Sequence, residues 1–123
     1  MKRGEVRWYE FEPPDKRRPV LALTRDSIIP YLNEITVAPI TSTIRGIPSE
    51  VVLGLDDGMP QDCAVNFDHI QTVPKRKIGR LIATLSTEKM SRAAQAIAFA
   101  LGVDELLEKL HLPVGRGIGR DYL

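Results

Sequence analysis

The feature that most constrains the fold is a change in the spacing of apolar residues late in the chain. Before it, apolar side chains come in short alternating or continuous runs, broken by proline, glycine and aspartate, which is typical of β-strands. From Met90 onward they recur at spacings of three, four, seven and eleven residues, which is one face of a helix. We therefore predict a mainly β protein with a C-terminal helix, built as a small twisted barrel.

The expected strands are short and lie before the helix. They fall at residues 5–11, 20–23, 34–40, 49–55, 63–66 and 69–73. In the first, alternation predicts Val6 and Trp8 on one face and Arg7, Tyr9 and Phe11 on the other. Trp8 and Phe11 are interpreted as core residues. In the third, Pro39 predicts an edge strand or a bulge, because proline cannot donate to a sheet ladder.

The helical part has recognisable start and stop signals. Met90, Ala93, Ala94, Ile97 and Leu101 form its predicted apolar face. Ser86 or Thr87 is placed to cap its start, and Gly102 is placed to end it. Asp104 is expected to cap a second short helix over residues 105–110. The glycine-rich residues 111–123 are predicted to be a flexible tail, which leaves residues 1–110 as one domain.

Composition bounds the environment of the protein. The single cysteine, Cys63, cannot form an internal disulfide and is consistent with a reducing cytoplasm. We expect it to be a small, partly buried packing residue. No apolar run approaches the ~20 residues of a membrane helix, and the first residues do not resemble a signal peptide, so we expect a cytoplasmic protein without a membrane segment. The net charge of +1 is too small to indicate nucleic-acid binding by itself.

Common catalytic motifs are missing from the sequence. There is no glycine-rich phosphate loop, no paired CxxC, no HExxH and no nucleophile elbow. The two histidines, His69 and His111, are far apart and have no metal-ligand partners nearby in sequence. We therefore expect no metal and no cofactor. An enzyme built from this chain would work by positioning, charge and hydrogen bonds.

Four stretches of the chain, read in order, resemble one toxin family. Residues 2–8 (KRGEVRW) are similar to an R-G-E-[VI]-x-W opening, and residues 17–23 (RRPVLAL) to an R-P-[VA]-L-V-[IL] strand. Residues 37–42 (VAPITS) resemble V-A-[PA]-[IL]-T-[ST], and residues 81–102 resemble the family's C-terminal block. Together they make the chain, from about residue 2 to residue 110, similar to the MazF/PemK toxins of type II toxin–antitoxin systems.

The resemblance implies both a fold and an activity. The fold would be an SH3-like barrel that forms a homodimer. The activity would be sequence-specific, metal-independent cleavage of single-stranded RNA, whether messenger, ribosomal or transfer RNA, which arrests growth until a cognate antitoxin binds. The family's catalytic arginine and threonine correspond to Arg18 and Thr41 in this sequence.

The chemistry of these two residues suits that reaction. RNA supplies its own nucleophile, the 2′-hydroxyl, and cleavage then needs proton transfer and charge stabilisation at phosphorus. A guanidinium such as that of Arg18 donates to two phosphoryl oxygens and stays charged. Thr41 is a poor base and is assigned the task of orienting the reactants. Taken without the resemblance, Arg18 before Pro19 is an ordinary surface pair and Thr41 an ordinary turn residue.

Further residues are candidates for RNA contacts. Residues 67–73 resemble the family's [DE]-Q-I-R-T-[IV] segment, with His69 in place of the glutamine. His69 is hypothesised to assist acid–base chemistry or to stack on a base, and the alternative is a hydrogen-bonded strand histidine. The other predicted RNA-binding residues are basic or hydroxylic, and would track phosphates if the fold brings their loops together: Lys16, Arg17, Ser42, Lys75, Arg76 and Lys77.

Two other functions remain open at this level. One is a barrel that binds a peptide or nucleic acid without cutting it. The other is a gyrase-poisoning toxin of the CcdB type, which shares the fold but acts through a C-terminal Trp-Gly-Ile-like end. This chain ends Gly-Arg-Asp-Tyr-Leu, which does not match that end.

Overall fold

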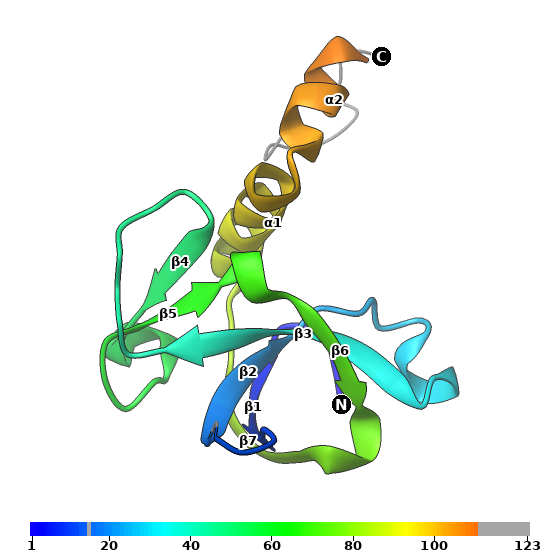
Figure 1. Cartoon of the computed structure of the whole chain (residues 1–123), viewed down its shortest axis with the longest axis vertical. Helices are drawn as coiled ribbons and strands as arrows, with labels where there is room; N and C mark the ends of the chain where they lie inside the picture. Colours follow the sequence, from blue (N-terminus) through cyan, green and yellow to red (C-terminus); the bar gives the residue numbers. More distant parts are fainter. Residues whose placement is uncertain (15, 111–123) are drawn as a thin grey trace.

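The computed structural model describes residues 1–14 and 16–110 as a strongly curled β-sheet from which a helical arm projects (Figure 1). The strands are β1 (Glu5–Glu10), β2 (Arg17–Ala22), β3 (Glu34–Thr41), β4 (Glu50–Leu53), β5 (Cys63–Asn66), β6 (Gln71–Pro74) and β7 (Ile78–Thr84). The arm is made of α1 (Thr87–Leu101) and α2 (Val103–Lys109). The prediction of a mainly β chain with a C-terminal helix is confirmed. The predicted tail, residues 111–123, lies outside the described residues.

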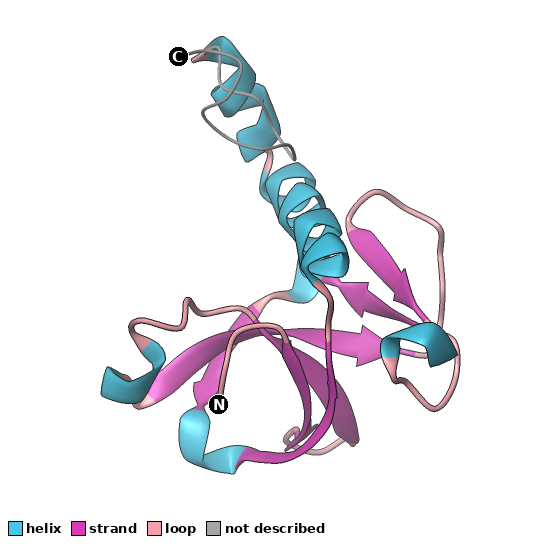
Figure 2. Ribbon diagram, turned by 180° about the vertical axis from the view of Figure 1, so that it is seen from behind, coloured by secondary structure: helices cyan, strands magenta, loops and turns pink. Residues whose placement is uncertain are grey.

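All strand pairs are antiparallel, and β3 lies at the centre of the sheet. The strand order is β4-β5-β3-β2-β1-β7, and β6 also pairs with β3. The sheet curls into the barrel-like form visible in Figures 1 and 2. In the part of the chain described, no ladder joins β6 to β7, and the short 3-10 helix η4 (Lys75–Lys77) connects them instead. The fold is thus an open version of the predicted barrel.

Pro39 does not mark an edge strand, because β3 has partners on both sides, so the edge alternative of that prediction is wrong. β3 pairs with β2 along one edge, and along its other edge it pairs first with β6, up to Val37, and then with β5, from Ile40. Pro39 lies in the gap between those two partners. A residue without an N–H donor is tolerated there because the ladder is interrupted on that side.

The two faces of the sheet serve two hydrophobic cores, which explains why β2 is apolar along most of its length. Leu21 and its neighbours on the same face belong to the larger core, which packs under α1. Val20 and Ala22 belong to a smaller core inside the barrel, together with Tyr9, Ile29, Ile35, Val37 and Val73. Because successive residues of a strand point to opposite faces, a strand buried on both faces has a continuous apolar run.

Strand β1 follows the alternation expected of it. Val6 enters the larger core, and Tyr9, on the opposite face, enters the smaller one, although the pairing with β7 shifts register between these two residues. Trp8 is only half-buried and does not join a core, so its core assignment is wrong. Phe11 packs against the smaller core, with its ring centroid 4.8 Å from that of Tyr9 in an edge-to-face arrangement.

Helix α1 begins where the sequence predicts. Ser86 caps it, because its Oγ accepts a hydrogen bond from the Lys89 N–H at 3.1 Å, and Gly102 ends it with a φ of 70°. Asp104 does not cap α2, which follows Gly102 directly and starts at Val103. Its carboxylate accepts only the N–H of the next residue, Glu105.

The buried face of α1 is rotated from the predicted one. Met90, Ala93 and Ile97 pack on the larger core as expected, whereas Ala94 and Leu101 are exposed. Small residues are the most deeply buried of the helix: Ala93, Ala96 and Ala98. The end of α1 extends beyond the sheet, so Leu101 has no strand beneath it (Figure 1). Neither α1 nor α2, nor any other described helix, is long and apolar enough to cross a membrane.

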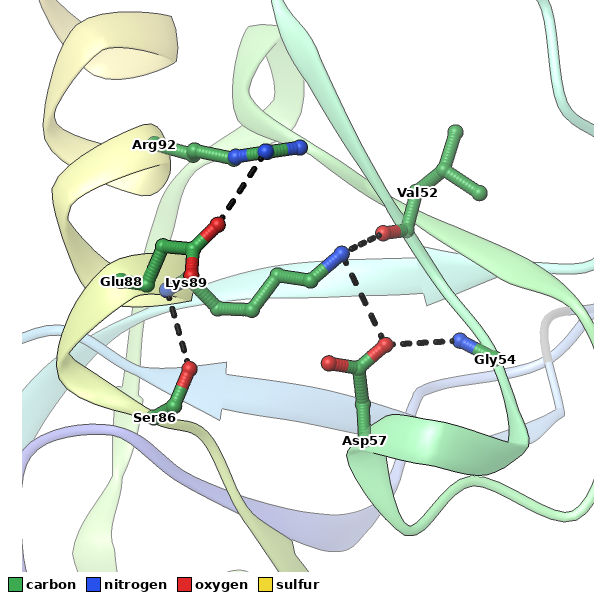
Figure 3. Close-up of polar contacts among 7 residues, drawn as sticks. All are labelled: Val52, Gly54, Asp57, Ser86, Glu88, Lys89 and Arg92. Carbon is green, nitrogen blue, oxygen red and sulfur yellow. Dashed lines mark hydrogen bonds and ion pairs between the residues drawn. The ribbon is translucent and has the colours of Figure 1, made fainter.

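Lys89 fastens the start of α1 to the sheet (Figure 3). Its Nζ donates to the carbonyl oxygen of Val52 at 2.9 Å and lies 3.7 Å from the carboxylate of Asp57. The same carboxylate oxygen accepts the N–H of Gly54 at 2.9 Å. β4 is the terminal strand of the sheet, so this lysine covers part of its unpaired edge.

Strand β7 was not among the predicted strands. Only Ala83 of its seven residues is buried, and Gly79, Arg80 and Leu81 are exposed, so the segment has no alternating pattern. Its position is set by long-range pairing with β1. Other strand ends differ by a few residues, and two of these differences affect the site: β2 starts at Arg17 rather than residue 20, and β3 includes Thr41.

Candidate active site

A cavity of about 390 Å³ opens where the sheet splits beside β3. Arg18, Thr41 and His69, the three residues predicted to act in catalysis, all line it. The rest of its wall is formed by Phe11, Pro39, Ile40, Thr43, Arg45, Glu50, Asn66 and Gln71. The structure thus brings together residues from five separate stretches of sequence.

Strand register explains why Arg18 and Thr41 share the cavity. The β2–β3 ladder ends with the pair Val20 and Pro39. Continuing that register by two residues along each strand directs Arg18 and Thr41 to the same cavity, which both of them line. Both side chains belong to the row that includes Val20 and Val37 of the smaller core. That row is apolar inside the barrel and becomes polar at its mouth, where both residues are half-buried. The barrel thereby holds two polar groups side by side on rigid strands.

The Thr41 hydroxyl is already oriented. Its Oγ1 accepts a hydrogen bond from the Thr43 N–H at 3.1 Å. A threonine hydroxyl has one proton to donate, and this bond does not use it. Thr41 can therefore donate to an oxygen of a ligand in the cavity without losing its anchor.

The loop after β3 contributes residues that the sequence analysis missed. Thr43 and Arg45 continue the spacing of two that begins at Thr41, and both line the cavity, whereas Ser42 does not. Glu50 holds this loop, because its Oε1 accepts the N–H groups of Arg45 at 2.8 Å and Gly46 at 2.7 Å. The spacing of two residues from Thr41 through Thr43 to Arg45 could have indicated from the sequence that Arg45 faces the same side as Thr41.

His69 lies on a fixed turn and not on a strand. It ends the 3-10 helix η3 (Phe67–His69), in which the Asn66 side chain accepts the N–H of Asp68 at 2.9 Å. Ser49 donates its hydroxyl to the Asp68 carboxylate at 2.6 Å, and the Phe67 side chain is buried. The alternative of a strand histidine is therefore wrong. These hydrogen bonds fix the residues that precede His69 in the turn. The exposed His69 imidazole lines the cavity.

The basic residues predicted to bind RNA do not line the cavity. Arg17 faces away from it, because it precedes Arg18 on the same strand, and it lines an adjoining hollow with Lys77. Lys75 donates through Nζ to the carbonyl oxygen of Ile29 at 2.9 Å. Lys16 and Arg76 are exposed. The structure thus brings Arg17 and Lys77 together, but beside the candidate site.

Two further observations, on the single cysteine and on possible metal ligands, bear on the chemistry of the molecule. Cys63 is buried, and its pKa is raised by burial and by the negative charges of Asp57 and Asp62, so it is a packing residue with a weakly nucleophilic thiol. Within residues 1–14 and 16–110, no three histidine, cysteine, aspartate or glutamate side chains gather as a metal site would require.

Comparison with known proteins agrees with this geometry. A family model described as the PemK-like, MazF-like toxin of type II toxin–antitoxin systems matches residues 2–101. Endoribonuclease MazF3 of Mycobacterium tuberculosis is 42% identical over 90 residues, which cover 73% of this chain and 87% of that protein. The family-model match spans all seven strands and α1.

Solved structures give the same result at the level of the fold. Mycobacterium tuberculosis toxin MazF-mt6 is similar with a TM-score of 0.74 and 38% identity, covering 80% of this chain and 96% of that one. An endoribonuclease in complex with its cognate antitoxin, from a mycobacterial species, also has a TM-score of 0.74, at 25% identity over 84% of this chain and 96% of that one. On the sequence match and the shared fold, this chain belongs to the PemK-like, MazF-like toxins of type II toxin–antitoxin systems.

Proposed function

We propose that this protein is an endoribonuclease toxin that cleaves single-stranded RNA at the cavity beside β3. The observation that carries the proposal is the placement of Arg18 opposite Thr41 at the polar end of one strand row. The relatives described above are named endoribonucleases, which supports the same activity here. Neutralisation by a cognate antitoxin is part of the proposal, by analogy with the toxin solved in such a complex.

The reaction uses the nucleophile that RNA already contains. The 2′-oxygen attacks the adjacent phosphorus, the bond from phosphorus to the 5′-oxygen breaks, and the products are a 2′,3′-cyclic phosphate and a 5′-hydroxyl. One group takes the proton of the 2′-hydroxyl and another gives a proton to the leaving oxygen. No step requires a metal ion if a fixed cation stabilises the charge on phosphorus.

Arg18 is the group suited to stabilise that charge. Its guanidinium donates to two phosphoryl oxygens and remains protonated throughout the reaction. It is half-buried on a strand, so little entropy is lost when it binds. A single donor of this kind typically contributes about 3 kcal/mol to transition-state stabilisation.

Thr41 and His69 take the remaining tasks. The Thr41 hydroxyl, anchored by the Thr43 N–H, donates to a phosphoryl oxygen or to the attacking oxygen and orients it. The His69 imidazole lines the same cavity, where it can assist proton transfer or stack on a base. Arg45, Asn66 and Gln71 offer donors and acceptors with which the cavity can select bases.

Cleavage by pure protein tests this proposal. A long single-stranded RNA is incubated in EDTA with the wild type, with Arg18→Ala and with Arg25→Ala, which removes an exposed arginine after the far end of β2. We expect discrete cuts by the wild type and Arg25→Ala, and a loss of about a hundredfold or more in Arg18→Ala. Equal cutting by Arg18→Ala would move the chemistry to another residue. If several RNAs stay intact with the wild type, the non-catalytic binding module replaces the nuclease.

A further inference from the structure

A second hollow, of about 330 Å³, lies on the outer side of β1 and β2. We infer that it binds single-stranded RNA that extends beyond the cleaved segment, and we name it the Trp8 hollow after its aromatic residue. This inference rests on the proposed nuclease function. The hollow is lined by Trp8, Arg17, Lys77 and Arg80, with Tyr9, Glu10 and Gly79.

The first support is the stacked pair of Arg17 and Trp8. The guanidinium carbon of Arg17 lies 4.3 Å from the centroid of the Trp8 ring. A guanidinium stacked on a ring still has its N–H donors free at the edge of its plane, where they can bind phosphates. The flat pair of guanidinium and indole also offers a surface on which a nucleobase can stack. Base stacking on such surfaces tolerates any sequence, which suits RNA outside a recognition motif.

The second support is charge. Arg17, Lys77 and Arg80 face Glu10 in the hollow, three cations against one carboxylate. Lys77 also pairs with Glu12 at 3.5 Å, but their side chains are 40% and 86% exposed. Such an exposed pair contributes little to stability, so a phosphate can take the place of Glu12 at little cost.

The third support is continuity with the cavity. Phe11 lines the cavity and also a shallow hollow beside it, which Lys77 borders as well. Lys77 in turn lines the Trp8 hollow. A strand leaving the cavity therefore meets the Phe11 ring, passes Lys77 beside the carboxylates of Glu10 and Glu12, and reaches the stacked pair of Arg17 and Trp8 with Arg80. Aromatic rings and cations in succession are typical of surfaces for single-stranded nucleic acid.

The single tryptophan of the chain makes the test specific. Because Trp8 is the only tryptophan, intrinsic fluorescence reports on this hollow alone. The probes are fully 2′-O-methylated RNAs of mixed sequence, about 6 and about 20 nucleotides long, which cannot be cut and bracket the usual site sizes. We expect the longer RNA to change Trp8 fluorescence and the shorter one to change it much less.

Variants then locate the contacts. In anisotropy titrations, Arg17→Gln/Arg80→Gln should bind the long RNA about tenfold more weakly than the wild type and lose about 1.4 from the slope of log affinity against log salt. Arg80→Gln alone, a change at an exposed residue, should show about half that loss of slope. The matched control is Arg25→Gln, an exposed arginine after the far end of β2.

The outcomes separate this inference from the nuclease proposal. Unchanged Trp8 fluorescence with the long RNA, or equal affinity of the double variant and the wild type, overturns the inference even if RNA is cleaved. A response to an oligoglutamate peptide but not to RNA also overturns it, and would assign the hollow to an acidic protein segment. Cleavage of a short RNA by the double variant at the wild-type rate is expected, because the cavity is intact.

Discussion

Two consecutive arginines have different surroundings because they lie on a strand. Arg18 faces the cavity with Thr41, while Arg17 stacks on Trp8 on the other side of β2. Successive side chains of β2 point to opposite faces, so Val20 enters the smaller core and Leu21 the larger one. The same alternation places Arg17 and Arg18 on opposite faces. Replacement of either arginine is therefore expected to affect a different step, chemistry for Arg18 and binding of long RNA for Arg17.

His69 gives the first prediction at this scale. In His69→Gln, we expect kcat for RNA cleavage to fall by about tenfold to a hundredfold, because general acid–base catalysis by one side chain typically contributes about 100-fold or more. The measurement is kcat for a mapped substrate. The same rate and the same cut site in the variant would exclude His69 from proton transfer.

Glu5 gives a prediction about stability. Its carboxylate is half-buried, and the desolvation raises the pKa, but hydrogen bonds from the Lys2 N–H and the Arg7 side chain, with the positive charges of Arg7 and the N-terminus, lower the pKa by more. A lowered folded-state pKa stabilises the protein above the unfolded value, about 4.3 for glutamate, and this stabilisation is lost as the pH falls through the folded pKa.

The test compares Glu5→Gln with the wild type in denaturant unfolding across pH. We expect the variant to be about 1 kcal/mol less stable at pH 7, since hydrogen bonds to a charged group are lost. The difference should shrink as the pH falls below about 4. A gap that stays constant down to pH 2 would assign the effect to packing rather than to charge.

At the scale of elements, the loop between β3 and β4 depends on one carboxylate. Glu50 accepts the N–H groups of Arg45 and Gly46, and so places Arg45 at the cavity. In Glu50→Ala we expect kcat/KM to fall by about tenfold, because the loop loses two charge-assisted hydrogen bonds. Glu50→Gln should retain most of the activity, since an amide oxygen accepts the same bonds.

The control for this loop is Glu34→Ala, which removes an exposed carboxylate at the start of β3. Thermal unfolding of each variant shows whether the fold is intact. If Glu50→Ala cleaves like the wild type, the loop does not need this anchor. If Glu50→Gln is as defective as Glu50→Ala, the charge itself is required.

Elements with strong apolar periodicity could be predicted from the sequence, and those fixed by partners could not. β2 and β3 were found because their apolar runs are buried on both faces. β7 was missed because its single buried residue, Ala83, leaves no pattern, and only pairing with β1 makes it a strand.

The residues of the candidate site likewise fall into those that could be predicted from the sequence and those that could not. Arg18 and Thr41 were identified through motif resemblance, and strand register then explains their proximity. Arg45 and Glu50 were missed because their roles depend on how a loop folds back onto β4. The basic residues were treated as one group because sequence alone does not show which side of a strand each one faces.

At the scale of the whole molecule, the side formed by β4 and α1 exposes several large apolar side chains. Val52, Phe99 and Leu101 are 44%, 50% and 65% exposed, and Val52 and Phe99 line a groove of about 630 Å³. Exposed apolar side chains on neighbouring elements favour association with another protein surface. We expect this side to form the twofold interface of a homodimer.

Mass measurement in solution tests that expectation. The wild type should be a dimer at micromolar concentration, and Phe99→Glu should be a folded monomer, because a buried carboxylate without a partner opposes association. Thr84→Glu, at an exposed position of β7, serves as the control and should remain dimeric. A monomeric wild type, or a dimeric Phe99→Glu, would place the interface elsewhere or remove it.

The pleat of β2 also limits how such a chain can change over generations. An inserted or deleted residue between Arg18 and Val20 would put these two side chains on opposite faces of β2, so either the arginine would leave the cavity or Val20 and Ala22 would leave the core. Of the described residues in the connection before Arg17, only Phe11 at its start packs against a core, so we expect changes in the length of this connection to leave both cores intact. Lineages of such toxins can therefore diverge in what they recognise by altering this connection, while Arg18 and the barrel are inherited as one unit.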